Sequence, residues 1–316
     1  MKHTLTKGKA AFLDYYSRAM PQFSSADDLE KYLTAKNPPV LLFSPFHTLE
    51  LQQLWRAQEL SWSPVSWFPQ ALVWPPEVPI GTSLPGYTQG WLYSLNPASL
   101  LSVLALSPQT KETILDASAA PGGKTLAIAS LINTSRSTLI ANDVSGPRFK
   151  RLRTVLKLFG LPDLPTWRLP IQIIARETNL RFDKILLDAP CSSEKHVFNS
   201  KHHLKTWSEK RIAALSKLQI HLIASLLPAL KPGGTLVYST CALTPLENEA
   251  VIGKILKEHP DLYLSELPKT LPVYSPGLSG FGIPDHSLHR ILRVNDPRLP
   301  LDPMFVAALR SFSTSS

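Results

Sequence analysis

The chain contains two cysteines, and each of them follows a short apolar run. Cys191 lies in LLDAPCSS and Cys241 lies in VYSTCAL. A buried structural cysteine usually lies inside an apolar run, whereas these two stand among Ser, Thr, Pro and Asp, just after predicted strands, where reactive groups collect. The two thiols are therefore candidates for chemistry, with a pair of buried structural cysteines as the alternative.

Carboxylates close the neighbouring apolar runs. Asp116, Asp143 and Asp188 each end a run that predicts a strand. An acid at the end of the second strand of a nucleotide-binding unit can accept both hydroxyls of a ribose, which makes Asp143 the candidate for that role. A helix cap or a turn former is the alternative interpretation of an Asp at such a position.

A turn of small residues follows Asp116 in the sequence ILDASAAPGGKTLA, residues 114–127. The residues of this turn are Ala119, Ala120, Pro121, Gly122 and Gly123, and a helix is predicted from Lys124 onward. Backbone N–H groups and the positive end of that helix favour an anionic group in the turn. The pattern is neither GxGxxG nor a P-loop, because Ser118 occupies the position where a P-loop needs its first glycine.

The elements that would position these groups alternate between strands and helices from residue 97 onward. Strands are predicted at 113–116, 138–143, 164–167, 184–188, 235–239, 288–294 and 304–309, and helices at 99–106, from 124, 147–159, 208–230 and 245–258. This order predicts an α/β fold with a mostly parallel sheet and helices on both faces. The ligand crevice of such a sheet lies outside the carboxyl ends of its strands, where the carboxylates and cysteines are expected.

The first 96 residues predict a small α+β accessory region ahead of a catalytic domain at 97–316. Apolar residues recur at helical spacing over 12–33. Residues 38–97 are rich in proline and tryptophan, with short strands such as VLLF and QALVW and one helix at 49–58. Because the net charge of +9 favours a polyanion such as RNA or DNA, the region is either a nucleic-acid-binding module or a plain packing unit.

A basic helix is predicted after Asp143. Its residues Arg148, Lys150 and Arg151 lie opposite an apolar stripe. Charge on the outer side of a helix is either a solvated face or a face that contacts phosphates, and the pattern leaves both open.

Several classes of protein are disfavoured. The sequence has no run of 18 or more apolar residues, so we expect no membrane span. The N-terminus lacks an apolar signal core, which favours a cytoplasmic protein, with a transit peptide as the alternative because the segment before Asp14 is basic. Two cysteines do not make a disulfide scaffold. His202 and His203 are predicted to lie in a loop, and Cys and His do not gather at zinc-ligand spacing, so we expect no metal.

The chain resembles the Sun/Nop family of RNA 5-methylcytosine methyltransferases in the order and spacing of four sequence blocks. These blocks are DASAAPGGKT, LLDAPCSS, KPGGTLVYSTC and the ENE that follows. The resemblance covers residues 97–309 and, more loosely, the region upstream. The segments SSEKHVFNSKHH and DPMFVAALR are most similar to the family's short branch, which has no extra RNA-binding domain. The resemblance implies a Rossmann-like class I fold that uses S-adenosylmethionine.

By this resemblance the chain is an RNA (cytosine-5-)-methyltransferase that acts on rRNA or tRNA. Cys241 would be the nucleophile that adds to carbon 6 of cytosine, and Cys191 would assist release of the methylated base. Asp188 would hold the ring edge and supply or share the proton on nitrogen 3. Lys124 would lie beside the cofactor or the base. The residues expected around the cofactor are those of the glycine turn with Lys124, Asp143, Arg148 and Asp188. The target base must be unstacked to enter, so single-stranded or loop RNA is expected.

Two positions depart from the pattern of the family. Ser118 stands where many members have cysteine, which is a mild change. The family usually has an Asp after the third strand, near the adenine, whereas Arg168 stands there and Glu177 is the one acid between Asp163 and Asp183. Either backbone groups and apolar contacts hold the adenine, or the pocket is altered.

Two other functions compete with this one. A DNA cytosine methyltransferase shares the Pro-Cys dipeptide, but it uses that cysteine as its nucleophile and does not need the second. A non-catalytic RNA-binding or ribosome-assembly protein on the same fold would be favoured by the loss of either thiol, and both are present. The sequence does not name the RNA, the modified cytosine, a partner protein or the oligomeric state, for which a monomer is the default.

Overall fold

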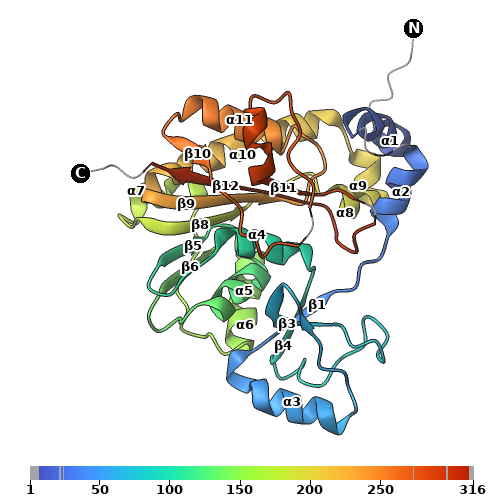
Figure 1. Ribbon diagram of the computed structural model, residues 1–316, viewed down its shortest axis with the longest axis vertical. Helices are drawn as coiled ribbons and strands as arrows, with labels where there is room; N and C mark the ends of the chain where they lie inside the picture. The colour runs from blue at the N-terminus through green and yellow to red at the C-terminus, as the bar shows by residue number, and fades with distance from the viewer. Residues whose placement is uncertain (1–6, 21–22, 24, 273, 297, 313–316) are drawn as a thin grey trace.

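A large sheet crosses the molecule, with helices on both of its faces (Figure 1). The structure is a computed structural model and describes residues 7–20, 23, 25–272, 274–296 and 298–312. The strands lie in the spatial order β10 (Leu262–Leu264), β12 (Met304–Ser311), β9 (Leu230–Thr240), β8 (Phe182–Asp188), β5 (Thr113–Asp116), β6 (Thr138–Asn142) and β7 (Thr166–Trp167), and β11 (Ile291–Val294) pairs with β12 outside this path.

The strands from β9 to β7 pair in parallel, and β12 runs antiparallel to β9. Within this core β8 pairs with β9 so that Asp188 lies opposite Ser239. The carboxyl ends of β5, β6, β8 and β9 therefore open on one edge of the sheet. This arrangement confirms the predicted α/β fold and brings residues that are far apart in the sequence to the same edge.

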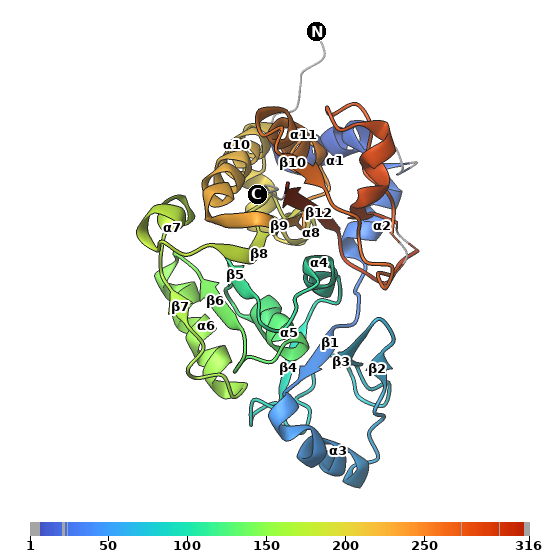
Figure 2. The same ribbon diagram turned by 60° about the vertical axis from the view of Figure 1, so that its left-hand side comes forward.

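Helices cover the two faces of the sheet, as Figures 1 and 2 show. One face carries α4 (Ala98–Leu106), α5 (Gly123–Leu131) and α6 (Gly146–Leu158), and the other carries α7 (Ile171–Glu177), α10 (Glu209–Leu226) and α11 (Glu249–Glu258). A buried apolar cluster fills the space on each face. The stretch Glu209–Ala229 is long and apolar enough to cross a membrane, but this is weak evidence, because Leu222, Ile223 and Leu226 are buried among the residues of the second cluster.

The first 96 residues contribute two pieces at opposite ends of the molecule (Figure 1). Helices α1 (Gly8–Ala19) and α2 (Ala26–Thr34) pack against α8 (Glu194–Phe198) and α9 (Lys201–Thr206). The second piece is a four-stranded antiparallel sheet of β2 (Pro64–Val65), β3 (Phe68–Val73), β1 (Val40–Phe43) and β4 (Leu92–Leu95), with η1 (Pro45–His47) and α3 (Thr48–Ala57). This small sheet shares the apolar cluster of α4 and α5.

Three local predictions differ from the structure. His202 and His203 lie in α9 and not in a loop, because the Ser200 Oγ accepts the His203 N–H and so caps a helix. The strand predicted at 288–294 begins at Ile291, because a 3₁₀ helix, η3 (Asp285–Arg290), occupies the preceding residues. Strand β10 was not predicted, since three residues are too few to show a strand period.

A buried ion pair ties the antiparallel part of the sheet to the helix above it. The Arg293 Nη1 of β11 donates to both carboxylate oxygens of Glu249 in the first turn of α11, each at 2.6 Å. The Arg293 Nη2 also donates to the carbonyl oxygen of Leu243. Because both side chains are buried, removing one partner leaves the other charge without compensation.

We therefore predict that Arg293→Met lowers the free energy of unfolding by about 3–5 kcal/mol. The matched control is Lys254→Met, which breaks the exposed pair of Lys254 with Glu258 and should cost about 0.5 kcal/mol or less. Urea denaturation followed by circular dichroism measures both. Equal losses for the two variants would show that the buried pair does not hold β11 to α11.

Candidate active site

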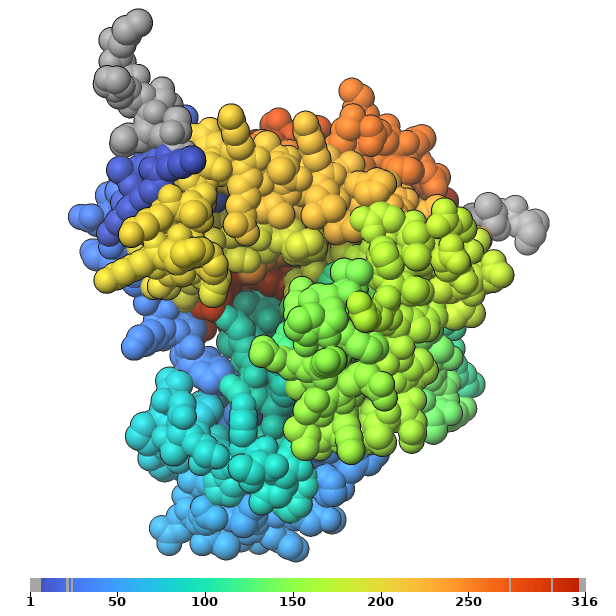
Figure 3. All heavy atoms as spheres, turned by 180° about the vertical axis from the view of Figure 1, so that it is seen from behind, coloured from blue at the N-terminus to red at the C-terminus, as the bar shows by residue number. Residues whose placement is uncertain are grey.

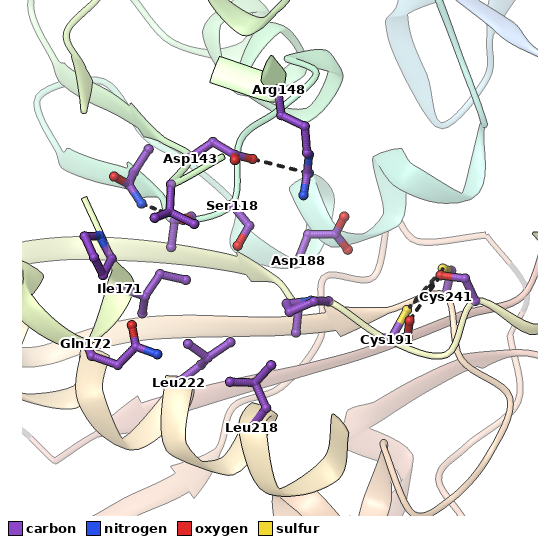
Figure 4. A pocket seen from close by; sticks show the side chains of 17 residues that line it. Ser118, Asp143, Arg148, Ile171, Gln172, Asp188, Cys191, Leu218, Leu222 and Cys241 are labelled. Carbon is purple, nitrogen blue, oxygen red and sulfur yellow. Dashed lines mark hydrogen bonds and ion pairs between the residues drawn. The ribbon is translucent and has the colours of Figure 1, made fainter. Parts of the chain in front are cut away.

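The residues predicted to do chemistry lie together at the carboxyl edge of the sheet (Figure 4). Asp188 is the last residue of β8, Asp143 follows β6, and Cys241 follows β9. In the space-filling view the molecule is hollowed between the segment of α8–α10 and the segment of α6 (Figure 3). The edge of the sheet therefore opens into a surface cleft.

Two cavities meet in this cleft. The first has a volume of about 540 Å³ and extends over Ser118, Asn142 and Asp143 toward Ile171 and Leu222. The second has a volume of about 450 Å³ and lies toward Asn96, Lys124, Lys195, His196 and Asp302. The residues that line both cavities are Asp188, Ser193 and Cys241. A carboxylate and a thiol thus stand between two compartments, an arrangement that suits a reaction between two bound molecules.

The two thiols are in contact. Their Sγ atoms are 3.3 Å apart, and both cysteines are free (Figure 4). The Ser193 Oγ lies 3.3 Å from the sulfur of Cys241 and 3.4 Å from that of Cys191. Cys241 is exposed and Cys191 is half-buried, and both line the first cavity. One sulfur can therefore attack a bound molecule while the other stays within reach.

The surroundings shift the pKa values of the two thiols in opposite directions. The hydrogen bond with Cys191 lowers the pKa of Cys241 below its ordinary value and outweighs the effect of desolvation, and Ser193 acts in the same direction. The same thiol–thiol contact raises the pKa of Cys191, together with burial. Cys241 is thus the more acidic thiol of the pair, the one that more readily becomes a thiolate.

Asp188 is held from two sides. The Lys124 Nζ lies 2.7 Å from its Oδ2, and the Ser239 Oγ donates to its Oδ1 at 2.9 Å. Burial alone would lower the pKa of Lys124, but the ion pair with Asp188 reverses this and raises the pKa above its ordinary value. Lys124 is therefore an ammonium group beside the cysteines, positioned by a carboxylate whose orientation is fixed.

The glycine turn is shaped to leave room at the start of α5. Gly122 has a φ of +125°, which side-chain-bearing residues rarely adopt, so glycine is required there. The Arg148 Nη2 donates to the carbonyl oxygen of Ala120 at 2.6 Å and so attaches α6 to the turn. A small cavity over the turn reaches Lys124 and Asp188, which brings the turn into contact with the thiol site.

Asp143 lies at the predicted position, and its side chain is 4% exposed. Its Oδ2 accepts the Ala120 N–H at 3.2 Å and lies 3.3 Å from the Arg148 Nη2, and its Oδ1 accepts the Ser145 N–H at 3.0 Å. Asp143 therefore organises the turn. Its Oδ1 also has a second lone pair for a ligand in the first cavity, which Asp143 lines.

Asp116 is buried behind the site and accepts the hydroxyl of Thr125 at 2.7 Å. Burial raises its pKa to about 6, against the opposing effects of Thr125 and Lys124. It lies beneath the turn and joins β5 to α5, so its role is to hold the turn in place.

The far end of the first cavity lacks a carboxylate at the position where Arg168 stands. Of the residues that the structure describes, Gln172 lines this end of the cavity and Arg168 does not. The Arg168 guanidinium lies next to Gly146 instead. Apolar side chains from two helices complete the wall, namely Ile171, Leu218 and Leu222. This end of the cavity suits a flat, weakly polar group.

Sequence reasoning did not identify Ser193, Gln172, Lys195 or Asp302 as site residues. Ser193 could have been found, because it stands two residues after Cys191 in the motif. Asp302 could not, since its partners Asn37, Asn96 and Lys195 come from three distant segments. Within the part of the chain that the structure describes, no group of three His, Cys, Asp or Glu residues is placed to hold a metal ion.

Comparison with known proteins gives a consistent result. A family model described as 16S rRNA methyltransferase RsmB/F matches residues 103–310. A ribosomal RNA small subunit methyltransferase F of Aeromonas hydrophila is 34% identical over 257 residues, which cover 78% of this chain and 53% of that protein. A ribosomal RNA small subunit methyltransferase B of Salmonella arizonae is 39% identical, over 58% of this chain and 42% of that protein. The chain thus spans about half the length of these curated relatives.

Solved structures share the architecture. A methyltransferase homolog protein from Pyrococcus horikoshii aligns with a TM-score of 0.74 and 26% identity, over 96% of this chain and 100% of that one. NSun6 from Pyrococcus horikoshii, solved with SFG, aligns with a TM-score of 0.79 and 19% identity, over 95% of this chain and 97% of that one. The latter likeness concerns the fold.

The thiol pair gives a direct prediction about reactivity. The rate at which iodoacetamide alkylates Cys241, followed against pH by peptide mass spectrometry, should report a pKa below the ordinary value of about 8.5. In Cys191→Ala the donor to Cys241 is lost, so this pKa should rise. An unchanged pKa in the variant would mean that Cys191 does not stabilise the thiolate.

Proposed function

Because the chain belongs to the 16S rRNA methyltransferase RsmB/F family, we propose that it methylates carbon 5 of a cytosine in RNA, with S-adenosylmethionine as the methyl donor. The observation that carries this proposal is the contact between the Cys191 and Cys241 sulfurs, 3.3 Å apart beside Asp188. Carbon 5 of cytosine is a poor nucleophile. A thiolate that adds to the neighbouring carbon 6 activates it, and a second group is then needed to reverse the addition.

The first cavity suits S-adenosylmethionine. The glycine turn lines the small cavity that adjoins the first one at Ser118 and Asp188. Backbone N–H groups at the start of α5 would face the carboxylate of the methionine part from there, and the Asp143 Oδ1 would accept a ribose hydroxyl. Gln172 and the apolar wall of Ile171 and Leu222 suit the adenine in place of a carboxylate. When bound, S-adenosylmethionine supplies the methyl group for carbon 5.

The second cavity suits the target base. It lies on the other side of Asp188 and Cys241, and its wall carries Lys124, Lys195 and His196. A cytosine in this cavity would reach the Cys241 sulfur without displacing the cofactor. A base stacked in a duplex cannot reach a sulfur inside a cavity, so the nucleotide must be unstacked from its neighbours before it can enter.

Each step of the proposed methylation is assigned to a residue of the site. The Cys241 thiolate adds to carbon 6, and the electron pair released into the ring moves to carbon 5, which becomes nucleophilic. Asp188 holds the ring edge and supplies or shares the proton that nitrogen 3 takes up as charge develops there, and the Lys124 ammonium group lies beside it. After the methyl group is on carbon 5, a base takes the carbon 5 proton, the electron pair of that C–H bond restores the C5–C6 double bond, and the C–S bond breaks with its electron pair on the Cys241 sulfur. We assign to Cys191 the donation of its thiol proton toward that departing sulfur, because the two sulfurs are in contact.

The presence of both thiols at one point favours this function over its rivals. A DNA cytosine methyltransferase would use the cysteine of the Pro-Cys dipeptide, here Cys191, but Cys191 is the less exposed of the two and its pKa is raised. A non-catalytic RNA-binding protein has no need for a pair of thiols and an ion pair at the meeting point of two cavities. The substrate is proposed to be ribosomal RNA, as for the relatives. Bisulfite sequencing of total RNA with and without the protein would name the cytosine.

The two cysteines predict opposite phenotypes. Cys241→Ala should lower methyl transfer to unmodified rRNA by roughly a thousandfold or more without forming an adduct, because no nucleophile is left. Cys191→Ala should instead accumulate a covalent protein–RNA complex that survives SDS gel electrophoresis, because the C–S bond forms but does not break. Ser130→Ala, which removes a hydroxyl bonded to the Ala127 carbonyl oxygen within α5, serves as the control for general disturbance and should keep turnover. A stable complex with Cys241→Ala, and none with Cys191→Ala, would reverse the two roles.

A further inference from the structure

Two adjacent tyrosines of α1 reach the two loops that carry the thiols. Tyr15 and Tyr16 are both buried, and their hydroxyl groups make hydrogen bonds with residues 229 and 178 positions away in the sequence. Helix α1 lies outside the large sheet (Figure 2) and does not line the cavities described above. The two tyrosine hydroxyls of α1 nevertheless form hydrogen bonds with the segments that follow the two cysteines.

Tyr16 acts on the loop of Cys191. Its hydroxyl donates to the Glu194 Oε1 at 2.6 Å, and the same oxygen accepts the Ser192 Oγ at 2.7 Å. Ser192 is the residue after Cys191, and its N–H donates to the Glu247 Oε2 at 3.0 Å. All of these groups are buried, and burial raises the pKa of Glu194 as well as that of Tyr16. Loss of one of these hydrogen bonds would leave a buried polar group without its partner, so the network ties the loop of Cys191 to α1.

Tyr15 acts on the loop of Cys241. Its hydroxyl is 2.9 Å from the Oγ1 of Thr244, which is fully buried. The intervening Leu243 packs in the same apolar cluster as both tyrosines, and so do Val197 and Phe198 of α8, the helix that follows the loop of Cys191. The two loops therefore share one packing surface on α1.

The two contacts have the same position relative to their cysteines. Glu194 stands three residues after Cys191, and Thr244 stands three residues after Cys241. We propose that α1 is a positioning element for the thiol pair: Tyr16 fixes the loop of Cys191, and Tyr15 fixes the loop of Cys241. This proposal rests on the proposed function for the roles of the two sulfurs, but the placement of the sulfurs can be tested without it.

The proposal predicts different consequences for the two neighbouring hydroxyl groups. Without the Tyr16 hydroxyl, Glu194 retains Ser192 as its partner, but the loop of Cys191 is no longer attached to α1, so release of the product should slow. Without the Tyr15 hydroxyl, the loop of Cys241 is loosened, so the first addition should slow. A merely structural role would lower stability in both cases and would not distinguish the two steps.

The test compares Tyr16→Phe and Tyr15→Phe with Tyr32→Phe, which removes a buried tyrosine hydroxyl on α2 that donates to the Val294 carbonyl oxygen. With unmodified small-subunit rRNA made in vitro, both α1 variants should lower kcat by roughly tenfold with little change in KM for S-adenosylmethionine. Tyr16→Phe should accumulate an SDS-resistant RNA adduct and Tyr15→Phe should not. Tyr32→Phe should behave as the wild type.

A second measurement needs no RNA. Diamide oxidation of the Cys191–Cys241 pair, followed as a loss of two hydrogens by intact-mass spectrometry, reports how well the sulfurs are held together. Both α1 variants should form this disulfide roughly tenfold more slowly than the wild type and Tyr32→Phe. Slow oxidation without any methyl transfer by the wild type would contradict the proposed function but keep the positioning role. Oxidation and adduct levels equal to those of Tyr32→Phe would overturn the positioning role.

Discussion

The contact between two sulfur atoms is the constraint on which the rest of the structure depends. Cys191 and Cys241 follow neighbouring parallel strands, and the register that places Asp188 opposite Ser239 brings the two loops to one point. The contact with Cys191 lowers the pKa of Cys241, and the ion pair of Lys124 with Asp188 lies beside the two sulfurs. A shift of β8 against β9 by one residue would separate the sulfurs and turn Asp188 away.

The two N-terminal pieces pack against the elements that hold the thiol pair in place. Helices α1 and α2 pack on the side of the molecule where the thiol loops leave the sheet, while the small sheet of β1–β4 packs on the face of α4 and α5. Between them, Asn37 and Asn96 meet Asp302 at the wall of the second cavity, where Lys195 also binds it. A region that composition alone marks as accessory is thus part of the frame around the candidate site.

The sequence pattern predicted the features that depend on residues close together in the chain. The alternation of strands and helices gave the sheet, and the position of Asp143, Asp188 and the cysteines after strands gave the site edge. The pattern could not give contacts between distant segments, such as Tyr16 with Glu194 or Asn37 with Asp302, because no sequence spacing records them. The pattern also predicted a loop at His203, whereas the side chain of Ser200 caps a helix there.

One measurement tests the central claim most directly: the wild-type chain, S-adenosylmethionine and RNA transcribed with 5-fluorocytosine, followed by peptide mass spectrometry. Fluorine at carbon 5 cannot be removed as a proton is, so the C–S bond that forms should persist. The account predicts one RNA adduct, carried by Cys241, on a base that has also gained a methyl group. An adduct on Cys191, or methyl transfer without any covalent complex, would contradict it.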